Sequence, residues 1–376
     1  MIYLDNAATT YPKPESVYKK IDYANRELAF NSGRGSYKKS KEVSEIIDDT
    51  RKIIAKWVNE SNYNKVIFST SSTEALNRII FGIEWREGDN VYVSPFEHNS
   101  IIRPLEKIKE LYNINIRIIE FDKETWEISE ELEDQFAMNN PKYIFMSSKS
   151  NVCGLKLPFK QVFEMGKKYS SINILDASQS FGVDKEINNI NTDFIIFAGH
   201  KSLYATFGVA GFIITGNYEL KTTIFGGTGS DTLNPNMPDV LPGRYEAGSK
   251  NSIALIGLNE SCKWLEKTNV EEKEIELTEY LYSKIEELNN IICYLPKDKN
   301  KCIGILSINV KNYLAEEVGI ILDDEFDICV RTGYHCSPYI HDFLGTKEFG
   351  GTIRISLNYF NTKEDINKLI ESLKTF

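Results

Sequence analysis

Two short segments decide the fold of this chain: Ile172-Asn-Ile-Leu-Asp-Ala-Ser-Gln179 and Phe194-Ile-Ile-Phe-Ala-Gly-His-Lys201. Each begins with an apolar run of strand length and ends in polar or charged residues. Apolar strands of this kind are typical of a parallel sheet covered by helices, in which ligands bind beyond the carboxyl ends of the strands. The two segments therefore predict buried strands that deliver Asp176 and Lys201 to one site.

The same pattern continues on both sides of these segments. Strands are expected over residues 65–68, 90–93, 114–121, 143–146, 172–175, 194–197 and 211–214, and helices over 74–83, 100–111 and 159–169. Strands that alternate with helices form βαβ units, which place helices on both faces of the sheet. The sequence therefore predicts an α/β fold with a mostly parallel sheet.

A stretch rich in glycine and proline interrupts this alternation at residues 226–249, where no helix or strand of ordinary length fits. Long loops of this kind are often functional. The chain beyond it contains helical patterns over 253–267, 270–288 and 364–374, with strands over 303–310 and 352–357. This order predicts a second, smaller α+β domain in the C-terminal part.

The charge and composition of the chain restrict its function. Its 376 residues include 44 Lys and Arg and 54 Asp and Glu, and the net charge of −10 argues against a general nucleic-acid binder. The first residues lack the basic start and apolar core of a signal peptide, and no apolar run is long enough to span a bilayer. We therefore expect a cytoplasmic protein without membrane association, whose cysteines are reduced.

Polar residues follow several of the predicted strands. They are Ser71-Ser-Thr-Glu74, Pro95-Phe-Glu-His-Asn99, Lys149-Ser-Asn151, Asp176-Ala-Ser-Gln179 and Ala198-Gly-His-Lys201. Because the carboxyl ends of parallel strands meet at one edge of a sheet, these hydroxyl, imidazole, amide, carboxylate and ammonium groups are expected to form a single site.

Taken singly, each of these groups has an ordinary explanation. Ser71 and Glu74 have the spacing of a capping box, although a helix N-terminus also favours a bound phosphate. Asp176 can hydrogen-bond a turn, whereas a buried carboxylate needs a cationic partner such as a protonated pyridine nitrogen. Lys201 can be a solvated surface charge or, at an enclosed strand end, a Schiff-base nucleophile.

The C-terminal segment Arg331-Thr-Gly-Tyr-His-Cys336 is a second candidate cluster. A metal site could use Cys329, His335, Cys336 and His341, but these residues lack the paired spacing of common zinc sites. Alternatively Cys336 is a nucleophile, because His335 and Arg331 are neighbours that favour the thiolate form.

Two arginines and the remaining cysteines complete the candidates. Arg331 and Arg354 are suited to bind a substrate carboxylate with two hydrogen bonds each, although surface salt bridges are the simpler explanation. Four cysteines are expected to be buried and inert: Cys153, Cys262, Cys293 and Cys302.

Together and in this order, these segments resemble the class V aminotransferase family, and within it the cysteine desulfurase and selenocysteine lyase group. The resemblance is carried by Tyr3-Leu-Asp-Asn-Ala-Ala-Thr-Thr10, Ser72-Thr-Glu-Ala-Leu-Asn77, Glu97-His-Asn99, Ser150-Asn151, Asp176-Ala-Ser-Gln179, Gly199-His-Lys201, Tyr245-Glu-Ala-Gly248, Arg331-Thr-Gly-Tyr-His-Cys336, Leu344-Gly-Thr346, Arg354-Ile-Ser-Leu357 and Tyr359-Phe-Asn-Thr362. The short segment around Cys336 is similar to that of group II desulfurases.

The resemblance implies an enzyme of fold type I that depends on pyridoxal 5'-phosphate (PLP). It implies a large PLP-binding domain over residues 15–255. Residues 1–14 and 256–376 would form a smaller α+β domain that carries Cys336.

The resemblance also implies a set of cofactor-binding residues: Ser72, Thr73, His98, Asn151, Asp176, Gln179, His200, Lys201 and Ser249. Lys201 would hold PLP as a Schiff base, Asp176 would pair with the pyridine nitrogen and Gln179 with the phenolic oxygen. His98 would stack on the ring and Asn151 would lie near the cofactor and substrate. Thr73 and His200 would hold the phosphate, and Ser249 would reach the phosphate of a neighbouring subunit.

On the same grounds Arg354 would bind the substrate carboxylate, with Arg331 and Asn151 nearby. Lys201, His98 and Cys336 would be the catalytic residues, and Cys336 would accept the sulfur. The chain departs from the family pattern at Ala198, Tyr334 and Tyr37, where the family commonly has Ser, His and His. Ala198 removes one phosphate hydroxyl, whereas the two tyrosines concern substrate choice and partner docking.

The expected activity is desulfuration of L-cysteine to L-alanine, a sulfurtransferase reaction that leaves a persulfide on Cys336 for an acceptor protein or small thiol. A homodimer is implied. The alternatives within the family are a selenocysteine lyase, a C–S lyase or an amino-acid epimerase. A non-catalytic scaffold would be expected to lack Lys201 or Asp176, and both are present.

Overall fold

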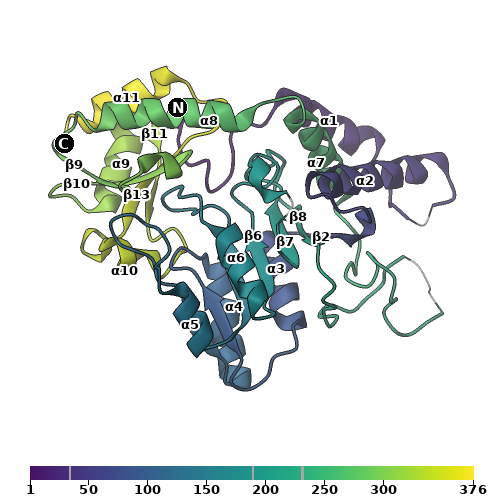
Figure 1. Cartoon of the computed structure of the whole chain (residues 1–376). Helices are drawn as coiled ribbons and strands as arrows, with labels where there is room; N and C mark the ends of the chain where they lie inside the picture. Colours follow the sequence, from purple (N-terminus) through teal and green to yellow (C-terminus); the bar gives the residue numbers. More distant parts are fainter. Residues whose placement is uncertain (34, 189, 230–232) are drawn as a thin grey trace.

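The computed structural model describes residues 1–33, 35–188, 190–229 and 233–376 of the chain (Figure 1). At its centre stands a seven-stranded sheet with the strand order β2-β8-β7-β6-β5-β3-β4. These strands are β2 (Val66–Ser69), β3 (Asn90–Val93), β4 (Asn115–Ile118), β5 (Pro141–Ser147), β6 (Ile172–Asp176), β7 (Phe194–Ala198) and β8 (Ala210–Ile214). β8 is antiparallel to both of its neighbours and the other pairs are parallel. The predicted α/β fold with a mostly parallel sheet is confirmed.

Both faces of this sheet are buried except at the edge strand β4, which explains why the other strands are mostly apolar. Successive residues of β5 enter two different hydrophobic cores. Ile144 belongs to the core that includes residues of α2 (Lys38–Trp57) and α6 (Phe159–Lys168). Phe145 belongs to the core that includes residues of α3 (Ser72–Gly82) and α4 (Asn99–Tyr112). The alternation follows from the two-residue period of a strand.

Two helices precede the region in which the sequence pattern was clear. They are α1 (Glu15–Glu27) and α2, and both pack against α7 (Ser252–Leu265) (Figure 1). The short α5 (Leu132–Met138) lies between β4 and β5 in the chain. The helix expected over 253–267 is therefore present as α7, beside the N-terminal helices. The domain boundaries after residues 14 and 255 stay a prediction.

A second sheet has the strand order β12-β13-β10-β9 and is antiparallel. Its strands are β9 (Ile291–Tyr294), β10 (Ile305–Val310), β12 (Arg331–Gly333) and β13 (Thr352–Ser356). The helices of this part are α8 (Val270–Ile285), α9 (Ala315–Phe326), α10 (Ile340–Leu344) and α11 (Lys363–Leu373). This C-terminal part has the α+β character that its sequence pattern predicts.

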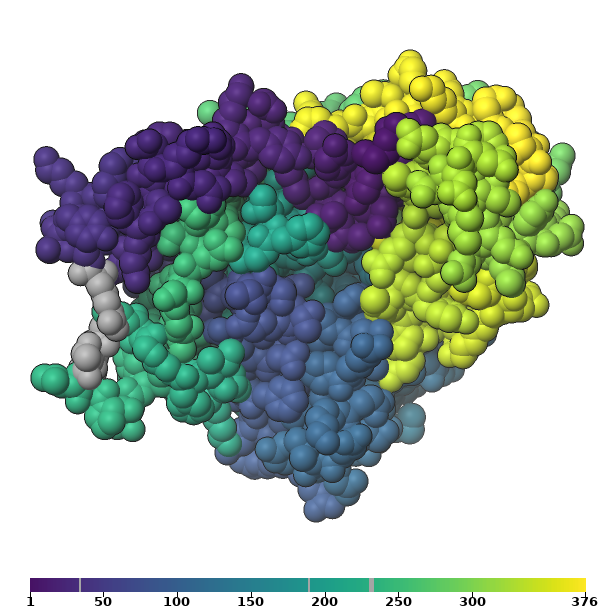
Figure 2. Space-filling model, turned by 180° about the vertical axis from the view of Figure 1, so that it is seen from behind, coloured from purple at the N-terminus to yellow at the C-terminus, as the bar shows by residue number. Residues whose placement is uncertain are grey.

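The N-terminus joins this second part. β1 (Ile2–Tyr3) pairs in parallel with β11 (Ile328–Cys329), and Asp5 bridges to Ser356. Figure 2 shows the result on the opposite face, where the purple N-terminal segment lies against the yellow-green C-terminal segment. Residues 1–14 therefore approach the central sheet from the side on which the second, antiparallel sheet lies.

The loop predicted over 226–249 lies between β8 and α7. Its described residues, 226–229 and 233–249, contain neither helix nor strand, and residues 230–232 lie outside the described part of the chain. Among the described residues, no helix combines the length and apolar character needed to cross a membrane.

Candidate active site

A cavity with an empty volume of about 320 Å³ lies at the carboxyl ends of β5 and β6. It is lined by Ser72, His98, Ser100, Ser147, Lys149, Asn151, Asp176, Ser178, Gln179 and Lys201. The structure thus brings together the predicted residues Ser72, His98, Asn151, Asp176, Gln179 and Lys201. Of the remaining residues, Lys149 and Ser178 lie inside segments that the sequence predicts at the site, although no role was assigned to them, and Ser100 and Ser147 lie within two residues of such segments.

Lys201 lies in the turn that follows β7, with its amine deep in the protein. Burial lowers the pKa of this amine, and the charges of Arg354 and Arg331 lower it further, while Asp176 opposes the shift. A lysine whose pKa is lowered is more often uncharged at neutral pH and is then a nucleophile and a base. These are the properties expected of a Schiff-base lysine.

Asp176 is the last residue of the buried strand β6. Its Oδ1 accepts hydrogen bonds from the backbone N–H of Ser178 at 3.0 Å and from its hydroxyl at 2.5 Å. The turn explanation for Asp176 is therefore correct for one oxygen. The second oxygen is left for a ligand in the cavity, where a cationic nitrogen would suit it.

His98 is the N-cap residue of α4. Its Nδ1 accepts from the Ser100 backbone N–H at 3.0 Å and contacts the Ser100 hydroxyl at 2.7 Å. An acceptor at Nδ1 assigns the proton of the neutral ring to Nε2. Burial, together with the charges of Lys201 and Arg331, lowers the pKa of His98 to about 3. His98 is therefore an uncharged ring that donates from Nε2.

Of the two hydrogen bonds of the capping box that the sequence predicts at the N-terminus of α3, only one is formed. The Ser71 hydroxyl accepts from the Glu74 N–H at 3.1 Å, whereas the Glu74 carboxylate accepts from the Thr70 N–H at 2.9 Å. Ser72 lines the cavity at this helix end, and the side chain of Thr73 is exposed outside it. The backbone N–H groups of Ser72 and Thr73 have no described partner at this helix end, and free N–H groups at a helix N-terminus favour an anion.

His200 does not line the cavity, although it precedes Lys201. Its ring stacks on Phe207 with centroids 4.5 Å apart, and its Nδ1 is buried without a hydrogen-bond partner in the described structure. Burial, with Lys201 and Lys13 nearby, lowers the pKa of His200 to about 3. A buried imidazole nitrogen without a partner is a group that a ligand could satisfy.

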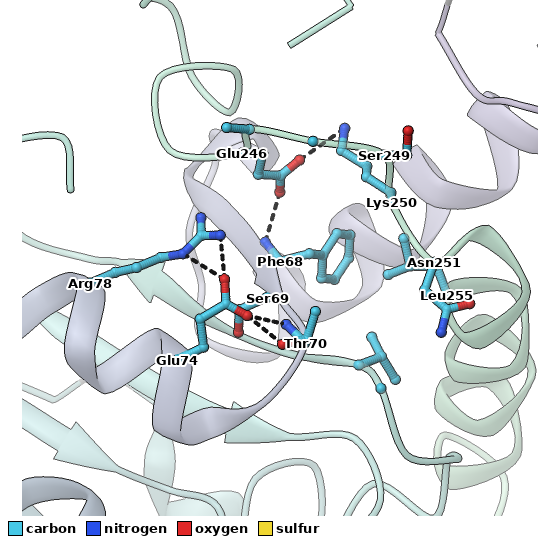
Figure 3. A pocket seen from close by; sticks show the side chains of 14 residues that line it. Phe68, Ser69, Thr70, Glu74, Arg78, Glu246, Ser249, Lys250, Asn251 and Leu255 are labelled. Carbon is cyan, nitrogen blue, oxygen red and sulfur yellow. Dashed lines mark hydrogen bonds and ion pairs between the residues drawn. The ribbon is translucent and has the colours of Figure 1, made fainter. Parts of the chain in front are cut away.

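Ser249 lies away from the cavity that contains Lys201. It is exposed and lines a separate pocket with Thr70, Arg78 and Lys250 (Figure 3). The wall of that pocket contains Glu246, which accepts from the Phe68 N–H at 2.7 Å and pairs with Lys250 at 2.9 Å (Figure 3). Within one chain, therefore, Ser249 does not reach the proposed site, and its role toward a neighbouring subunit stays a prediction.

Gln179 connects the cavity to the N-terminal segment. Its amide nitrogen donates to the Ala7 carbonyl at 2.9 Å, which uses one of its two N–H groups. The other N–H remains for a ligand such as a phenolic oxygen.

Cys336 lies in the loop after β12, next to the cavity residue Asn151. Arg331 Nη2 is 3.6 Å from Cys336 Sγ. Asn151 donates from Nδ2 to the His335 carbonyl at 2.8 Å and accepts at Oδ1 from the Ser337 hydroxyl at 2.9 Å. The Asn99 N–H also donates to the Cys336 carbonyl at 2.7 Å. The cysteine is thus held from both sides by residues of the Lys201 cavity and of α4.

His335 does not supply the positive charge that was expected beside Cys336. Its Nε2 donates to the Thr352 carbonyl at 3.0 Å, and burial holds the pKa of His335 well below its usual range. The ring is therefore neutral, and the expected electrostatic help from His335 is wrong. Arg331 is the cation that contacts the sulfur.

His341 holds the same loop by its two ring nitrogens. Nε2 donates to the Tyr334 carbonyl at 3.0 Å and Nδ1 accepts from the Thr346 hydroxyl at 2.7 Å. Both nitrogens are therefore used within the protein. No group of three or more possible metal ligands occurs among the residues that the structure describes.

Arg354 lies opposite Arg331 in the register of β12 and β13. Its guanidinium donates to the Asn151 carbonyl at 3.0 Å and to the Asp5 carboxylate, and its Nε is buried without a described partner. Two neighbouring cations, one of which is bonded to the cavity residue Asn151, favour an anionic substrate. The assignment of the substrate carboxylate to Arg354 stays a prediction, because Asp5 already neutralises part of its charge.

These groups fit PLP, because each has an atom that is not used in a hydrogen bond or ion pair within the described structure. Lys201 offers a buried amine, Asp176 an unoccupied carboxylate oxygen, α3 its first N–H groups and His200 an unpartnered nitrogen. When it binds here, PLP would be held by these groups with His98 beside the ring. Fold and site together define an enzyme of the PLP-dependent, fold type I class.

The chain belongs to the aminotransferase class-V family, whose model matches residues 2–369. It is 29% identical over 383 residues to a probable cysteine desulfurase of Methanothermobacter thermautotrophicus, covering 99% of this chain and 94% of that protein. It is 28% identical to a probable cysteine desulfurase of Pyrococcus abyssi, with coverage of 100% and 94%. The apo structure of a cysteine desulfurase from Thermococcus onnurineus superposes with a TM-score of 0.90 at 25% identity, again covering 100% and 94%.

Proposed function

We propose that this protein is a cysteine desulfurase that uses PLP, converts L-cysteine to L-alanine and retains the sulfur as a persulfide on Cys336. The observation that carries the proposal is the position of Cys336. Its sulfur is 3.6 Å from the Arg331 guanidinium, and Asn151, which lines the Lys201 cavity, fastens both residues that flank it. A sulfur atom in contact with a guanidinium group thus lies next to a cavity that contains an amine of lowered pKa.

PLP, when bound, supplies the electron sink that makes the α-proton of an amino acid acidic. The Lys201 amine, uncharged more often because its pKa is lowered, would accept that proton. The neutral His98 ring would stack beside the reacting groups, with a proton available on Nε2. Arg354 and Arg331 would orient the substrate through its carboxylate.

The sulfur transfer balances without an outside oxidant or reductant. The Cys336 thiolate attacks the sulfur of L-cysteine, so that an S–S bond forms while the Cβ–S bond breaks. The electron pair of the broken bond stays with Cβ, which then takes up a proton. In total, Cys336–SH and L-cysteine give Cys336–S–SH and L-alanine, and the persulfide is passed to an acceptor protein or a small thiol.

The assembly and location are part of the same proposal. A homodimer is supported by the exposed position of Ser249 outside the cavity of its own chain, which leaves it available to a neighbouring subunit. The six cysteines are free, as expected in the reducing cytoplasm. Light scattering of the purified protein tests the dimer.

The deciding experiment is product analysis with L-cysteine and the PLP-loaded protein. Alanine, together with a gain of one sulfur on Cys336 in the mass spectrum, is expected. Cys336→Ser should abolish both, and Cys329→Ser should change neither. Pyruvate in place of alanine would identify a C–S lyase, D-cysteine an epimerase, and turnover restricted to selenocysteine a selenocysteine lyase. Retention of desulfuration by Cys336→Ser would contradict the proposal.

Lys201→Ala addresses the scaffold alternative. The wild type should acquire a PLP absorbance band that survives gel filtration, and the variant should not. A wild type that takes up no PLP would favour the scaffold.

A further inference from the structure

Glu97 is a wholly buried carboxyl group directly before His98. Its Oε1 accepts from the Ser94 hydroxyl at 2.6 Å and from the Ser147 N–H at 2.9 Å. Its Oε2 accepts from the Ser147 hydroxyl at 2.6 Å. Every described hydrogen bond of this carboxyl group thus comes from a neutral serine, and no ion pair between described residues includes it.

Such a group is costly to keep in the interior. A buried carboxylate without a cation loses its hydration and gains only hydrogen bonds in return. Burial, together with the negative charge of Asp176, accordingly raises the pKa of Glu97 to about 7, although the hydrogen bonds from Ser147 and Ser94 oppose the shift. Buried carboxyl groups with shifted pKa values gather at functional sites, where their cost is retained for a reason.

Glu97 is connected to the cavity through Ser147. Ser147 is the partner of Asp176 in the register of β5 and β6, and both residues line the cavity. The same carboxyl group is the chain neighbour of His98, whose ring is on the cavity wall. Glu97 therefore lies behind Asp176, which would pair with the ring nitrogen of the cofactor, and behind His98, which would stack on the ring.

We propose that Glu97 is a positioning residue of this site: it holds the amide and hydroxyl of Ser147 beside Asp176, and it places a second carboxyl group behind the cofactor. The inference rests on the proposed function, since it assigns a role toward PLP. The charge of Glu97 acts on Asp176 as much as that of Asp176 acts on Glu97, because the interaction is mutual. The charged group that acts on it is Asp176 on β6, and its chain neighbour His98 is neutral.

The sign of the effect follows from this arrangement. Above its raised pKa of about 7, Glu97 is ionised, and its negative charge behind Asp176 stabilises positive charge on the cofactor, so the cofactor keeps its proton to higher pH. Removal of that charge should release the proton at lower pH.

Glu97→Gln in the PLP-loaded protein, without substrate, tests the role by pH titration of the PLP absorbance band. The midpoint should move to lower pH by about one unit. Glu110→Gln, which removes an exposed carboxylate on α4, is the matched control and should leave the midpoint unchanged. An unchanged midpoint in Glu97→Gln would overturn the proposal, whatever happens to stability.

Ser147→Ala keeps the test decisive if Glu97→Gln fails to fold. It removes the hydroxyl that links Glu97 to the cavity, so it should shift the midpoint as well. In the double variant the two shifts should be less than additive, since the residues act through one contact. Independent, fully additive shifts would contradict a role through Ser147. Because the readout is absorbance, a protein that binds PLP but forms no alanine would refute the proposed function and leave this inference open to test.

Discussion

Arg331 Nη2 lies 3.6 Å from Cys336 Sγ, and it is the cation in contact with that sulfur in the described structure. The neighbouring His335 is neutral because its ring is buried and donates to Thr352. The reactivity of the proposed nucleophile should therefore depend on the Arg331 guanidinium group.

Replacing Arg331 by Met should slow the alkylation of Cys336 by iodoacetamide at pH 7, because it removes the cation in contact with the sulfur and cationic neighbours make a cysteine more reactive. The measurement is mass-spectrometric labelling of the apoprotein over time. Cys329 serves as an internal reference, since burial and Asp323 raise the pKa of its thiol and its labelling should stay slow in both proteins. Equal rates at Cys336 with and without Arg331 would show that another group activates it.

His98 makes the apoprotein sensitive to acid. Its pKa is about 3 in the folded protein and about 6.5 in the unfolded chain, so the unfolded chain binds a proton that the native state refuses. Stability from this group is present above pH 6.5 and falls as the pH drops toward 3, by at most about 1.4 kcal/mol per pH unit.

His98→Asn tests this by urea unfolding of the apoprotein at pH 7.5 and 5.5. Other titrating groups contribute equally to both proteins, so the wild type should lose more stability over this interval than the variant. If the two losses are the same, His98 is protonated in the folded protein at pH 5.5.

The buried pair Arg51–Glu246 should be the costliest ion pair to break. Arg51 donates to both carboxylate oxygens at 2.8 and 2.7 Å and also to the Val66 carbonyl, and both side chains are almost completely buried. Glu246→Ala should destabilise the protein by about 3–5 kcal/mol, because it leaves a buried guanidinium without its partner. Denaturant unfolding measures the change.

The exposed pair Lys168–Glu133 provides the comparison. Lys168→Ala should cost less than about 1 kcal/mol, as surface pairs do. Similar costs for the two variants would mean that Glu246 is hydrated in solution.

Gly351 should be essential for the position of β12. It has φ +105°, and a Cβ there would overlap the Gly333 carbonyl at the end of the strand that begins with Arg331. Gly351→Ala should therefore destabilise the protein and slow Cys336 labelling. Gly350→Ala is the control, because Gly350 has φ +71° but open space around its Cβ, so it should show the backbone cost of about 1–2 kcal/mol without the loss of labelling. Equal rates of Cys336 labelling in the two variants would show that Gly351 does not determine the position of the nucleophile.

Most of the central sheet and much of the cavity could be predicted from sequence. An apolar run that ends in Asp176, and another that leads to Lys201, are local signals, because strand period and burial are written in adjacent residues. The helices α1 and α2 precede the first predicted strand, so no alternation of strands and helices indicated them and they were not predicted. Ser147 was not predicted because a serine at the end of a strand carries no distinguishing signal of its own.

The sequence by itself determined the α/β class, the strand ends that supply Asp176, His98 and Lys201, and the candidacy of Cys336. Only the tertiary structure decided how Cys336 is held, since Asn151 and His335 are 184 positions apart in the chain. It also decided that His335 is neutral and that Ser249 lies outside the cavity of its own chain. The physical reason is that short-range patterns encode the period and burial of single elements, whereas a contact or a pKa depends on which distant segments are packed together.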